Sequence, residues 1–585
     1  MLVAARKPVK TSSHSENRDD ATLHAWRAWG LAAASIAFPG AGFSTFNRAI
    51  LLRLLLMTAI PLLMVPPVVA QSAETARDEE IRASLQQVAS AIDAISTHAA
   101  EPVEVRRLLY DGAIAGALSR LDPFSVFLDE QQFLALRQQQ RGVRQGFGAV
   151  LNVQAGKITV LHAVADSPFA RAGLGPGDRI VAINGQRIAQ MGLEEMVELL
   201  QSARNGKVRL AVLQSGSVVP RDFELDPAEV ASPTVDKKFL IAPGIGYVHV
   251  AHIEKSTPTE IKEAINRMAS EPLNGLLLDL RGNPGGSVDA AAETVGLFLP
   301  EGGSSEADQP DRHLVVSLRG RNVPETRYST PTSGSSGSPN PAAFPRLPLV
   351  VLINENSASA SEIIAAALQE HDRAWLVGET TFGKGVAEAI MPLSQGAALV
   401  LTTARYFTPR GRSVQKALPA TALAGILSGG RDGLSLGLSQ GLPPGITTDN
   451  GRPLRQGGGL EPDEVVPQLR LRPLMAVLEE STAFINFAQA LLQRRGQVGR
   501  EFTATDEVVG QFEMFLLEAG FRAPEDEWEK VRPWVRWRIQ SEVLTLVYGI
   551  EAGEQVEAAN DPQAQAAVAA MNQAQRLVEI KQDGK

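Results

Sequence analysis

The chain has 585 residues, of which 44% are hydrophobic and 21% charged, and its formal net charge is −9 at pH 7. This length exceeds what one hydrophobic core supports, and the composition is typical of a folded globular protein. The chain contains no cysteine, which excludes disulfides, thiolate metal sites, a cysteine nucleophile and a lipid-modified N-terminal cysteine. Its acidic balance, with no run of Lys and Arg, predicts that nucleic acid is not a partner.

The apolar stretch Leu54–Val65 has the layout of a secretory signal, because Arg53 precedes it and Ala70 follows it as a possible cleavage position. A membrane span needs about 20 apolar residues, and Pro61 interrupts this shorter run. We therefore predict that residues 1–70 are a signal peptide and that the protein is exported to the periplasm, with membrane association as the alternative.

Two regions follow the signal. Apolar residues recur three and four positions apart over residues 71–145, which predicts an N-terminal helical region. The segment LDPFSVFLDEQQF closes it, and Asp122 within this segment is expected to form a turn. Over residues 146–225, short strands and two helices separated by turn signals predict a compact β-rich module.

Residues 226–473 read as an α/β region. Apolar strands such as NGLLLDL and PLVVLIN alternate with helices such as EIIAAALQEH, which predicts a mostly parallel sheet with ligands at the strand ends. Two segments, Ser335–Pro345 and Gly429–Gly459, are expected to be flexible surface loops. Residues 474–585 are again helical and would form either a cap or an oligomerisation surface.

The segment NENSASASEI places serines at positions 357, 359 and 361. Ser359, with Glu362 three residues later, fits a helix-opening capping box that involves no chemistry. A serine between a buried strand and a helix also lies beside free backbone amides and the positive end of the helix dipole, which suits acyl transfer. The local pattern leaves both interpretations open.

Lys384 lies between Gly383 and Gly385 in TTFGKGVAEAI, among apolar neighbours. Desolvation disfavours the ammonium form of a lysine, and a neutral lysine can accept the proton of a serine hydroxyl. The alternative is a surface lysine on a glycine-rich loop.

The segment DLRGNPGG, Asp279–Gly286, follows a predicted buried strand. Gly285 and Gly286 could present backbone amides to an oxyanion or let an extended peptide pass closely. Asp279 and Arg281 are expected to pair and hold the segment.

Metal-ligand spacing is suggested by His249, His252 and Glu254. On a strand, however, positions three apart point to opposite faces. We therefore predict no metal site, and no cofactor is expected.

Taken in order, these motifs resemble the carboxyl-terminal processing peptidases, also called tail-specific proteases. The resemblance covers roughly residues 113–473 and includes LDPFSVFLD, SPFARAGLGPGDRIVAING, DLRGNPGG, NENSASASEIIAAALQ, GETTFGKG and LTTARYFTPRGRSVQ. It implies an α/β fold with a crotonase-like protease core over 226–473, an inserted PDZ-like domain over 146–225, and flanking helical N- and C-terminal regions.

The resemblance also implies a catalytic dyad. In this family the middle serine of the run is the nucleophile and the lysine of FGKG is its base, which here correspond to Ser359 and Lys384. The amide of Ala360 and one from Gly285 or Gly286 would stabilise the oxyanion.

The PDZ-like domain would bind substrate tails as an added strand and hold their terminal carboxylate in a nest of backbone amides. The implied substrate-binding residues are Gly146, Phe147, Gly148, Ala149 and Val150.

One position departs from the family pattern. Glu388 stands four residues after the lysine, where the family usually has a glutamine that orients the base. A carboxylate there would favour the charged lysine. Glu388 is therefore expected to be protonated, to point away, or to keep activity low until the site rearranges.

The function implied is that of an exported serine endopeptidase that cuts unfolded or flexible protein tails near their C-termini, as a homo-oligomer. Two alternatives stay open. The chain could be a PDZ tail-binding protein with a silent dyad, or a protease that is inactive until a helical-repeat adaptor lipoprotein binds.

Overall fold

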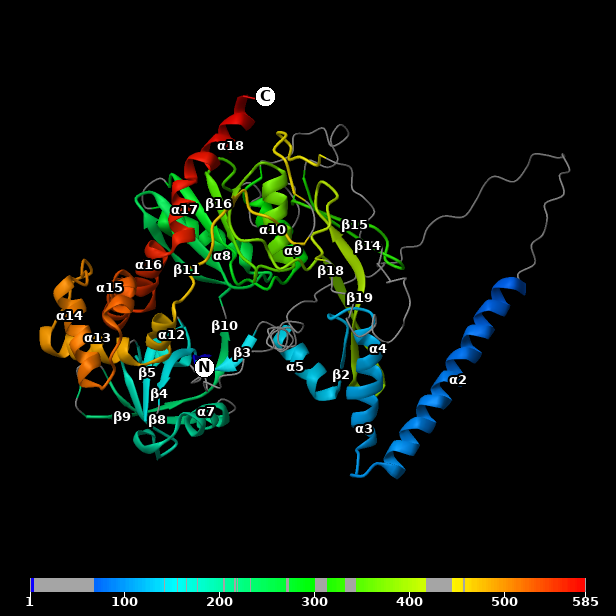
Figure 1. Ribbon diagram of the computed structural model, residues 1–585, viewed down its shortest axis with the longest axis horizontal. Helices are drawn as coiled ribbons and strands as arrows, with labels where there is room; N and C mark the ends of the chain where they lie inside the picture. The colour runs from blue at the N-terminus through cyan, green and yellow to red at the C-terminus, as the bar shows by residue number, and fades with distance from the viewer. Residues whose placement is uncertain are drawn as a thin grey trace. The chain divides into compact units, whose positions relative to one another are not determined.

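The computed structural model in Figure 1 describes most of the chain after residue 67. The described residues are 2–4, 68–140, 143–154, 156–164, 166–175, 177–203, 206–214, 217, 219–231, 233–269, 273–299, 313–331, 343–416, 445–455 and 458–583. Most of the predicted signal peptide, residues 5–67, lies outside them. Within these ranges, no helix combines the length and apolar character that crossing a bilayer requires.

The chain forms two compact units, one of residues 1–35, 134–387 and 403–585 and the other of residues 36–133 and 388–402. The smaller unit contains strand β2 (Val126–Leu128), which pairs antiparallel with the first residues of β19 (Ala398–Phe407). Before β2, Asp122 Oδ1 accepts hydrogen bonds from two backbone amides three or fewer residues ahead, so the predicted turn is confirmed. The helical segments between residues 68 and 140 are α2 (Val68–His98), α3 (Val105–Arg107), a π-helical segment (Leu108–Ile114), α4 (Ala115–Ser119) and α5 (Glu130–Gln140), and α5 continues into the larger unit.

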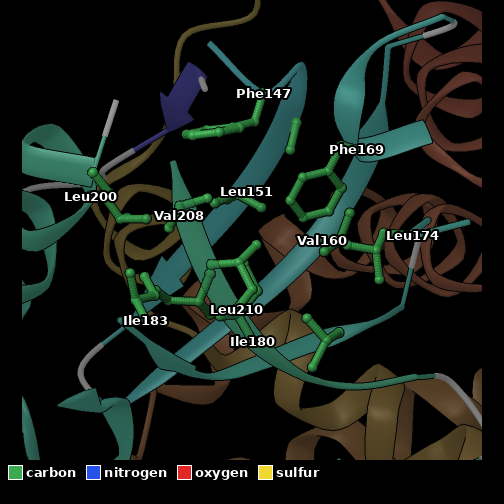
Figure 2. Packing of buried hydrophobic residues seen from close by; sticks show 14 of the residues in the cluster. Phe147, Leu151, Val160, Phe169, Leu174, Ile180, Ile183, Leu200, Val208 and Leu210 are labelled. Carbon is green, nitrogen blue, oxygen red and sulfur yellow. The ribbon is translucent and has the colours of Figure 1, made fainter. Parts of the chain in front are cut away.

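The β-rich module is one twisted sheet in the order β4-β5-β6-β8-β9, with β7 on β6 and the short β1 beside β4. Buried and less buried residues alternate along its strands, as in β8, and the buried set packs into one core that includes Phe147 and Phe169 (Figure 2). The elements are β1 (Leu2–Ala4), β4 (Ala149–Gln154), β5 (Lys157–Ala163), α6 (Pro168–Arg171), β6 (Arg179–Ile183), β7 (Gln186–Arg187), α7 (Leu193–Ser202), β8 (Val208–Leu213) and β9 (Arg221–Leu225).

The two ends of this module meet, since β3 (Val143–Gly146) pairs antiparallel with β10 (Ala228–Ala231). The chain therefore enters and leaves the module through one two-stranded ribbon.

The main sheet has the order β11-β12-β13-β16-β17-β20, in which only the β11–β12 pair is antiparallel. The predicted mostly parallel sheet is confirmed. Strands β13 and β16 are buried along their whole length, as expected for continuous apolar runs in a parallel sheet. The strands are β11 (Val235–Ala242), β12 (Ile245–Val250), β13 (Gly275–Asp279), β16 (Leu349–Ile353), β17 (Trp375–Gly378) and β20 (Glu464–Val465).

Helices cover both faces of this sheet, which shields the apolar strands from water (Figure 1). One face packs against the C-terminal helices in a cluster that joins Leu277 and Val350 to Ala564, Ala567 and Ala574. On the other face lie α8 (Thr257–Met268), α9 (Val288–Gly296) and α10 (Ala360–Glu370).

A second sheet has the order β15-β14-β19-β18. Sequence reasoning missed β14 (Leu314–Gly320), β15 (Thr326–Ser329) and β18 (Val386–Pro392). The C-terminal region consists of α12 (Pro473–Glu480), α13 (Ala483–Arg495), α14 (Asp506–Glu518), α15 (Glu525–Tyr548), α16 (Ile550–Asn560), α17 (Pro562–Ala569) and α18 (Met571–Asp583).

In the second predicted loop, Gly429–Gly459, the described residues 445–455, 458 and 459 are mostly exposed or half-buried, as expected for a surface segment. Asp449 bonds His371 at the end of α10, and Arg452 forms an ion pair with the buried Asp372. These two contacts tie the surface segment to the end of α10, which a Gly-rich composition does not reveal.

Candidate active site

Ser359 lies at the turn between β16 and α10, as the N-cap residue of the helix. Its backbone has φ 56° and ψ −116°, a left-handed conformation that a residue with a Cβ rarely adopts. Such strain costs about 1–3 kcal/mol and persists only where the surrounding structure enforces it, often at functional sites. The strain therefore distinguishes Ser359 from an ordinary capping serine, which has extended backbone angles.

The two flanking serines are structural. Ser357 Oγ donates to the carbonyl oxygen of Leu280 at 2.8 Å, and Ser361 Oγ donates to that of Asn283 at 3.0 Å. Ser359 Oγ donates no hydrogen bond to any of the described residues. Of the three hydroxyls, the middle one alone is left for chemistry within this part of the chain.

Glu362 is fully buried and accepts four hydrogen bonds. Its Oε2 accepts from the backbone amides of Ser359 and Lys384, each at 2.9 Å. Its Oε1 accepts from Thr381 Oγ1 at 2.5 Å and from the amide of Gly383 at 2.8 Å. Burial raises the pKa of Glu362, while these four donors oppose that rise by favouring the carboxylate.

Lys384 is buried and lies just before β18, on the loop that Glu362 holds. Because one carboxylate oxygen binds the amides of both Ser359 and Lys384, the two backbones are neighbours although the residues are far apart in sequence. The structure therefore contradicts the surface-lysine interpretation.

The segment Asp279–Gly286, which we call the 279–286 loop, lies directly against Ser359. A Cβ on Gly285 would lie 2.8 Å from the Cβ of Ser359 and 2.7 Å from the carbonyl oxygen of Ala358. Gly285 has φ 98°, so both its conformation and its surroundings require glycine.

Asn283 organises the 279–286 loop from within. Its Oδ1 accepts from the amide of Gly285 at 2.8 Å, and its Nδ2 donates to the carbonyl of Val250 at 2.6 Å. Its own carbonyl accepts from the amide of Ala358 at 2.9 Å. The Gly285 amide is thus already bonded, whereas the Ala360 amide belongs to the first turn of α10, where helical acceptors are lacking.

The predicted pairing of Asp279 with Arg281 is confirmed. Arg281 Nη2 lies 2.6 Å from Asp279 Oδ2, and Tyr247 donates to the same oxygen at 2.6 Å. Burial alone would raise the pKa of Asp279, but the charge and hydrogen bonds of Arg281, with His249 and Tyr247, lower it to about 2. Asp279 is therefore ionised at neutral pH.

His249 makes two bonds to acceptors. Its Nδ1 lies 2.5 Å from Asp236 Oδ1 and its Nε2 lies 3.1 Å from the carbonyl oxygen of Arg281. Burial lowers the pKa of His249, but the bond to Asp236 and the nearby Asp279 outweigh burial and raise it. Within the described ranges, no group of three or more histidine and acidic side chains is placed to hold a metal ion.

Glu388, the position that departs from the family pattern, lies on β18 and is buried.

In the β-rich module, the residues Gly146–Ala149 are buried and Val150 is half-buried. The carbonyl of Phe147 accepts from the amide of Phe169 at 3.0 Å, and that of Gly148 accepts from the amide of Val164 at 2.8 Å. Gly148 has φ 70°, and a Cβ there would lie 2.2 Å from the Cβ of Ser167. This close packing fixes the loop that precedes the edge of β4.

Sequence reasoning did not assign Glu362, Asn283 and Thr381 to the site. The capping-box pattern gave the position of Glu362 but only half of its role. The carboxylate of Glu362 also holds the loop that contains Lys384. This role depends on which loops meet in the folded chain, and no local sequence pattern contains that information.

Comparison with known proteins gives two family matches. A family model described as "Peptidase family S41" matches residues 244–421, and one described as "PDZ domain" matches residues 159–214. The first match contains Ser359, Glu362, Lys384 and the 279–286 loop.

Three relatives are similar over most of their own length. The "Carboxy-terminal processing protease CtpB" of Bacillus subtilis is 30% identical over 390 residues, which cover 66% of this chain and 75% of that protein. The "Carboxyl-terminal-processing protease" of Synechocystis sp. is 33% identical over 310 residues, 52% of this chain and 68% of that protein. The "Carboxy-terminal-processing protease" of Bartonella bacilliformis is 31% identical over 352 residues, 60% of this chain and 76% of that protein.

Proposed function

The chain belongs to the carboxyl-terminal processing serine proteases of peptidase family S41, and we propose that Ser359 is its nucleophile and Lys384 its general base. The resemblance inferred from the motifs is thereby confirmed, and so is the combination of this protease core with a PDZ domain. One observation carries the dyad: a single buried oxygen of Glu362 binds the amides of both residues.

The chemistry follows from the two side chains. The neutral amine of Lys384 accepts the proton of the Ser359 hydroxyl while the serine oxygen attacks the scissile carbonyl carbon. The carbon–nitrogen bond breaks, the leaving amine takes that proton, and the acyl group stays on Ser359. Water then attacks the ester, gives a proton to Lys384, and leaves a new carboxyl terminus, while the lysine returns the proton to the serine oxygen.

The tetrahedral intermediates need amide donors. The Ala360 amide lies at the positive end of α10, where negative charge is favoured. Because the Gly285 amide is bonded to Asn283 in this conformation, we assign the second donor to Gly286. Gly285 would contribute only after Asn283 releases it.

The substrates proposed are protein tails. PDZ domains bind peptide C-termini as an added strand with the carboxylate in a backbone nest, and here residues 146–150 would form that nest. The apolar stretch before Ala70 supports export to the periplasm. A homo-oligomer and a helical-repeat adaptor lipoprotein remain predictions from the family resemblance.

Cleavage of an unfolded protein with a flexible C-terminus tests the dyad. We expect Ser359→Ala and Lys384→Ala to lose at least about 1,000-fold in kcat, because each removes a group that forms or breaks a bond. Lys530→Ala, an exposed helix lysine, should cleave at the wild-type rate. Fragments are identified by mass spectrometry, and thermal unfolding verifies that each variant is folded.

Equal fragment yields from wild type, Ser359→Ala and Lys384→Ala would contradict the dyad and favour the silent tail-binding protein. Wild type that cleaves only after an adaptor is added would favour the adaptor-dependent protease. In the same assay we expect Glu388→Gln to cleave at an equal or faster rate, because the glutamine cannot stabilise a charged lysine. A slower Glu388→Gln variant would mean that the carboxyl group assists the reaction.

A further inference from the structure

We propose that Asp561, in the C-terminal helical region, is a positioning residue for the reaction that holds the 279–286 loop in place through Arg281. The inference rests on the proposed function, because it concerns the loop that would supply an oxyanion donor beside Ser359. Asp561 itself does not touch the reacting atoms.

Arg281 links two parts of the fold. Its Nη2 and Nε bond Asp279 within the loop. Its Nη1 faces the other way and lies 2.5 Å from Asp561 Oδ2 and 2.8 Å from Gln563 Oε1. The guanidinium is planar and rigid, so fixing its outer edge also fixes the edge that bonds the loop.

The connection from Arg281 to Ser359 is short. The carbonyl of Arg281 accepts from His249, and the next amide, that of Gly282, donates to Asn354 Oδ1 at 3.0 Å. Asn283 follows and binds the amide of Gly285, which lies against Ser359. A shift of Arg281 therefore moves backbone that leads, residue by residue, to Gly285 and to the adjacent proposed donor, Gly286.

The far end of the link is rigid. Asp561 is the N-cap of α17, and Ala564 and Ala567 of that helix are fully buried against the main sheet. Arg281, Asp561 and Gln563 also line a cavity of about 280 Å³ between the sheet and the C-terminal helices. Water can therefore solvate these groups when a charge is removed, so a single substitution need not unfold the region.

The two oxygens of Asp561 have separate tasks, which makes a precise variant possible. Oδ1 accepts from the amides of Gln563 at 2.8 Å and Ala564 at 3.4 Å, and Oδ2 pairs with Arg281. Asn and Ser cap helices about as well as Asp. Asp561→Asn and Asp561→Ser therefore keep the cap and remove the ion pair, and Asn also turns an N–H donor toward the guanidinium.

A matched control exists in the same region. Glu479 forms an ion pair with Arg538 at 2.5 Å, and its side chain is 22% exposed against 25% for Asp561. Arg538 also contacts Ser541, Glu542 and Glu557, all within the C-terminal helices. Glu479→Gln thus reports what the loss of a comparable ion pair in the C-terminal helices does by itself.

Steady-state cleavage of the unfolded substrate by the full chain tests the proposal. We expect Asp561→Asn and Asp561→Ser to lower kcat by roughly 10- to 100-fold, because misplacing a donor by about 1 Å costs that much. KM should stay unchanged, since tails bind at the PDZ domain. Glu479→Gln should keep the wild-type kcat even where its melting temperature falls.

Wild-type kcat in both Asp561 variants would overturn the proposal, as would a raised KM with unchanged kcat. An equal loss of kcat in Glu479→Gln would also overturn it, because general loosening of the helices would then be sufficient. Ser359→Ala, assayed beside them, distinguishes a failure of the proposed dyad from a failure of the role of Asp561. If it cleaves like wild type, the proposed dyad fails, whereas an inactive Ser359→Ala with active Asp561 variants refutes only the role of Asp561.

Discussion

At the scale of single residues, Glu362 explains how a serine and a lysine from different loops share one site. Its two oxygens accept from three backbone amides and one hydroxyl, so every contact uses the carboxylate as an acceptor. A buried carboxylate is costly unless donors satisfy it, and here the donors belong to the two loops that must meet. The cost of burying Glu362 is thus coupled to the correct placement of the proposed dyad.

Glu362→Gln tests this coupling. The glutamine amide presents N–H donors to groups that are themselves donors, so at least two bonds are lost. We expect the free energy of unfolding to fall by about 3 kcal/mol and kcat by about 100-fold. Thr381→Val, which removes one donor and leaves both dyad amides bonded, should cost less in both measurements. Normal kcat in a destabilised Glu362→Gln would show that Glu362 supports the fold without positioning the dyad.

Position 359 also shows why only one of three serines is available for chemistry. The strand-to-helix turn directs the side chains of 357 and 361 onto the carbonyls of the 279–286 loop, and the residue between them takes positive φ. Because the serines occupy every second position, the first and third hydroxyls bond the 279–286 loop and the middle hydroxyl faces the site.

At the scale of elements, the 279–286 loop is packed so closely against the start of α10 that its glycines differ in what they tolerate. Gly285 and Gly282 both have positive φ, at 98° and 69°. A Cβ on Gly285 would meet three atoms of residues 358–360 within 2.8 Å, whereas a Cβ on Gly282 would meet nothing within 4 Å. Substitutions at the two positions therefore separate the cost of a positive φ, which both share, from steric contact with the site, which only Gly285 has.

We expect Gly282→Ala to lose about 1 kcal/mol of stability, the usual cost of positive φ for an L-residue. Gly285→Ala should lose this amount and, in addition, most of its kcat, because its methyl group pushes Ser359 and the Ala360 amide away. Urea unfolding and the cleavage assay measure the two effects. Similar activities of the two variants would mean that the loop adapts without affecting Ser359.

At the scale of the whole molecule, tail capture and cleavage belong to different parts of the chain, the PDZ domain matched over 159–214 and the S41 core matched over 244–421. The two activities should therefore be separable by mutation. A defect in the PDZ domain should weaken binding of tails and leave the chemistry of Ser359 intact.

Gly148→Ala provides this test, since its Cβ would lie 2.2 Å from that of Ser167, within the proposed carboxylate nest. We expect the full-length variant to bind a fluorescent C-terminal peptide at least about 10-fold more weakly, which corresponds to 1.4 kcal/mol. Gly173→Ala has a similar φ of 73° and an open surrounding, so it serves as the control. Unchanged peptide affinity in Gly148→Ala would exclude residues 146–150 as the nest.

Much of this architecture could be predicted from local pattern. Apolar runs identified β13 and β16, and the capping box placed the start of α10 at Ala360. The missed strands, β14, β15 and β18, belong to an antiparallel sheet whose residues are of mixed polarity. The three-residue β2 was missed because its pairing with β19 bridges residues far apart in sequence.

By itself, the sequence determined the main strands and helices of the α/β region, and the motifs that contain the proposed serine, lysine and glycines and carry the family resemblance. The strands and helices follow from periodicity and from hydrogen bonds between near neighbours, whereas the family follows from the resemblance of the motifs and their order. Only the tertiary structure decided that Ser357 and Ser361 are structural, that one oxygen of Glu362 joins Ser359 to Lys384, and that Asp561 reaches Arg281. Each of these contacts joins groups whose distance is set by how the sheet and its helices stack, because a hydrogen bond forms only when folding has already brought its donor and acceptor within about 3 Å.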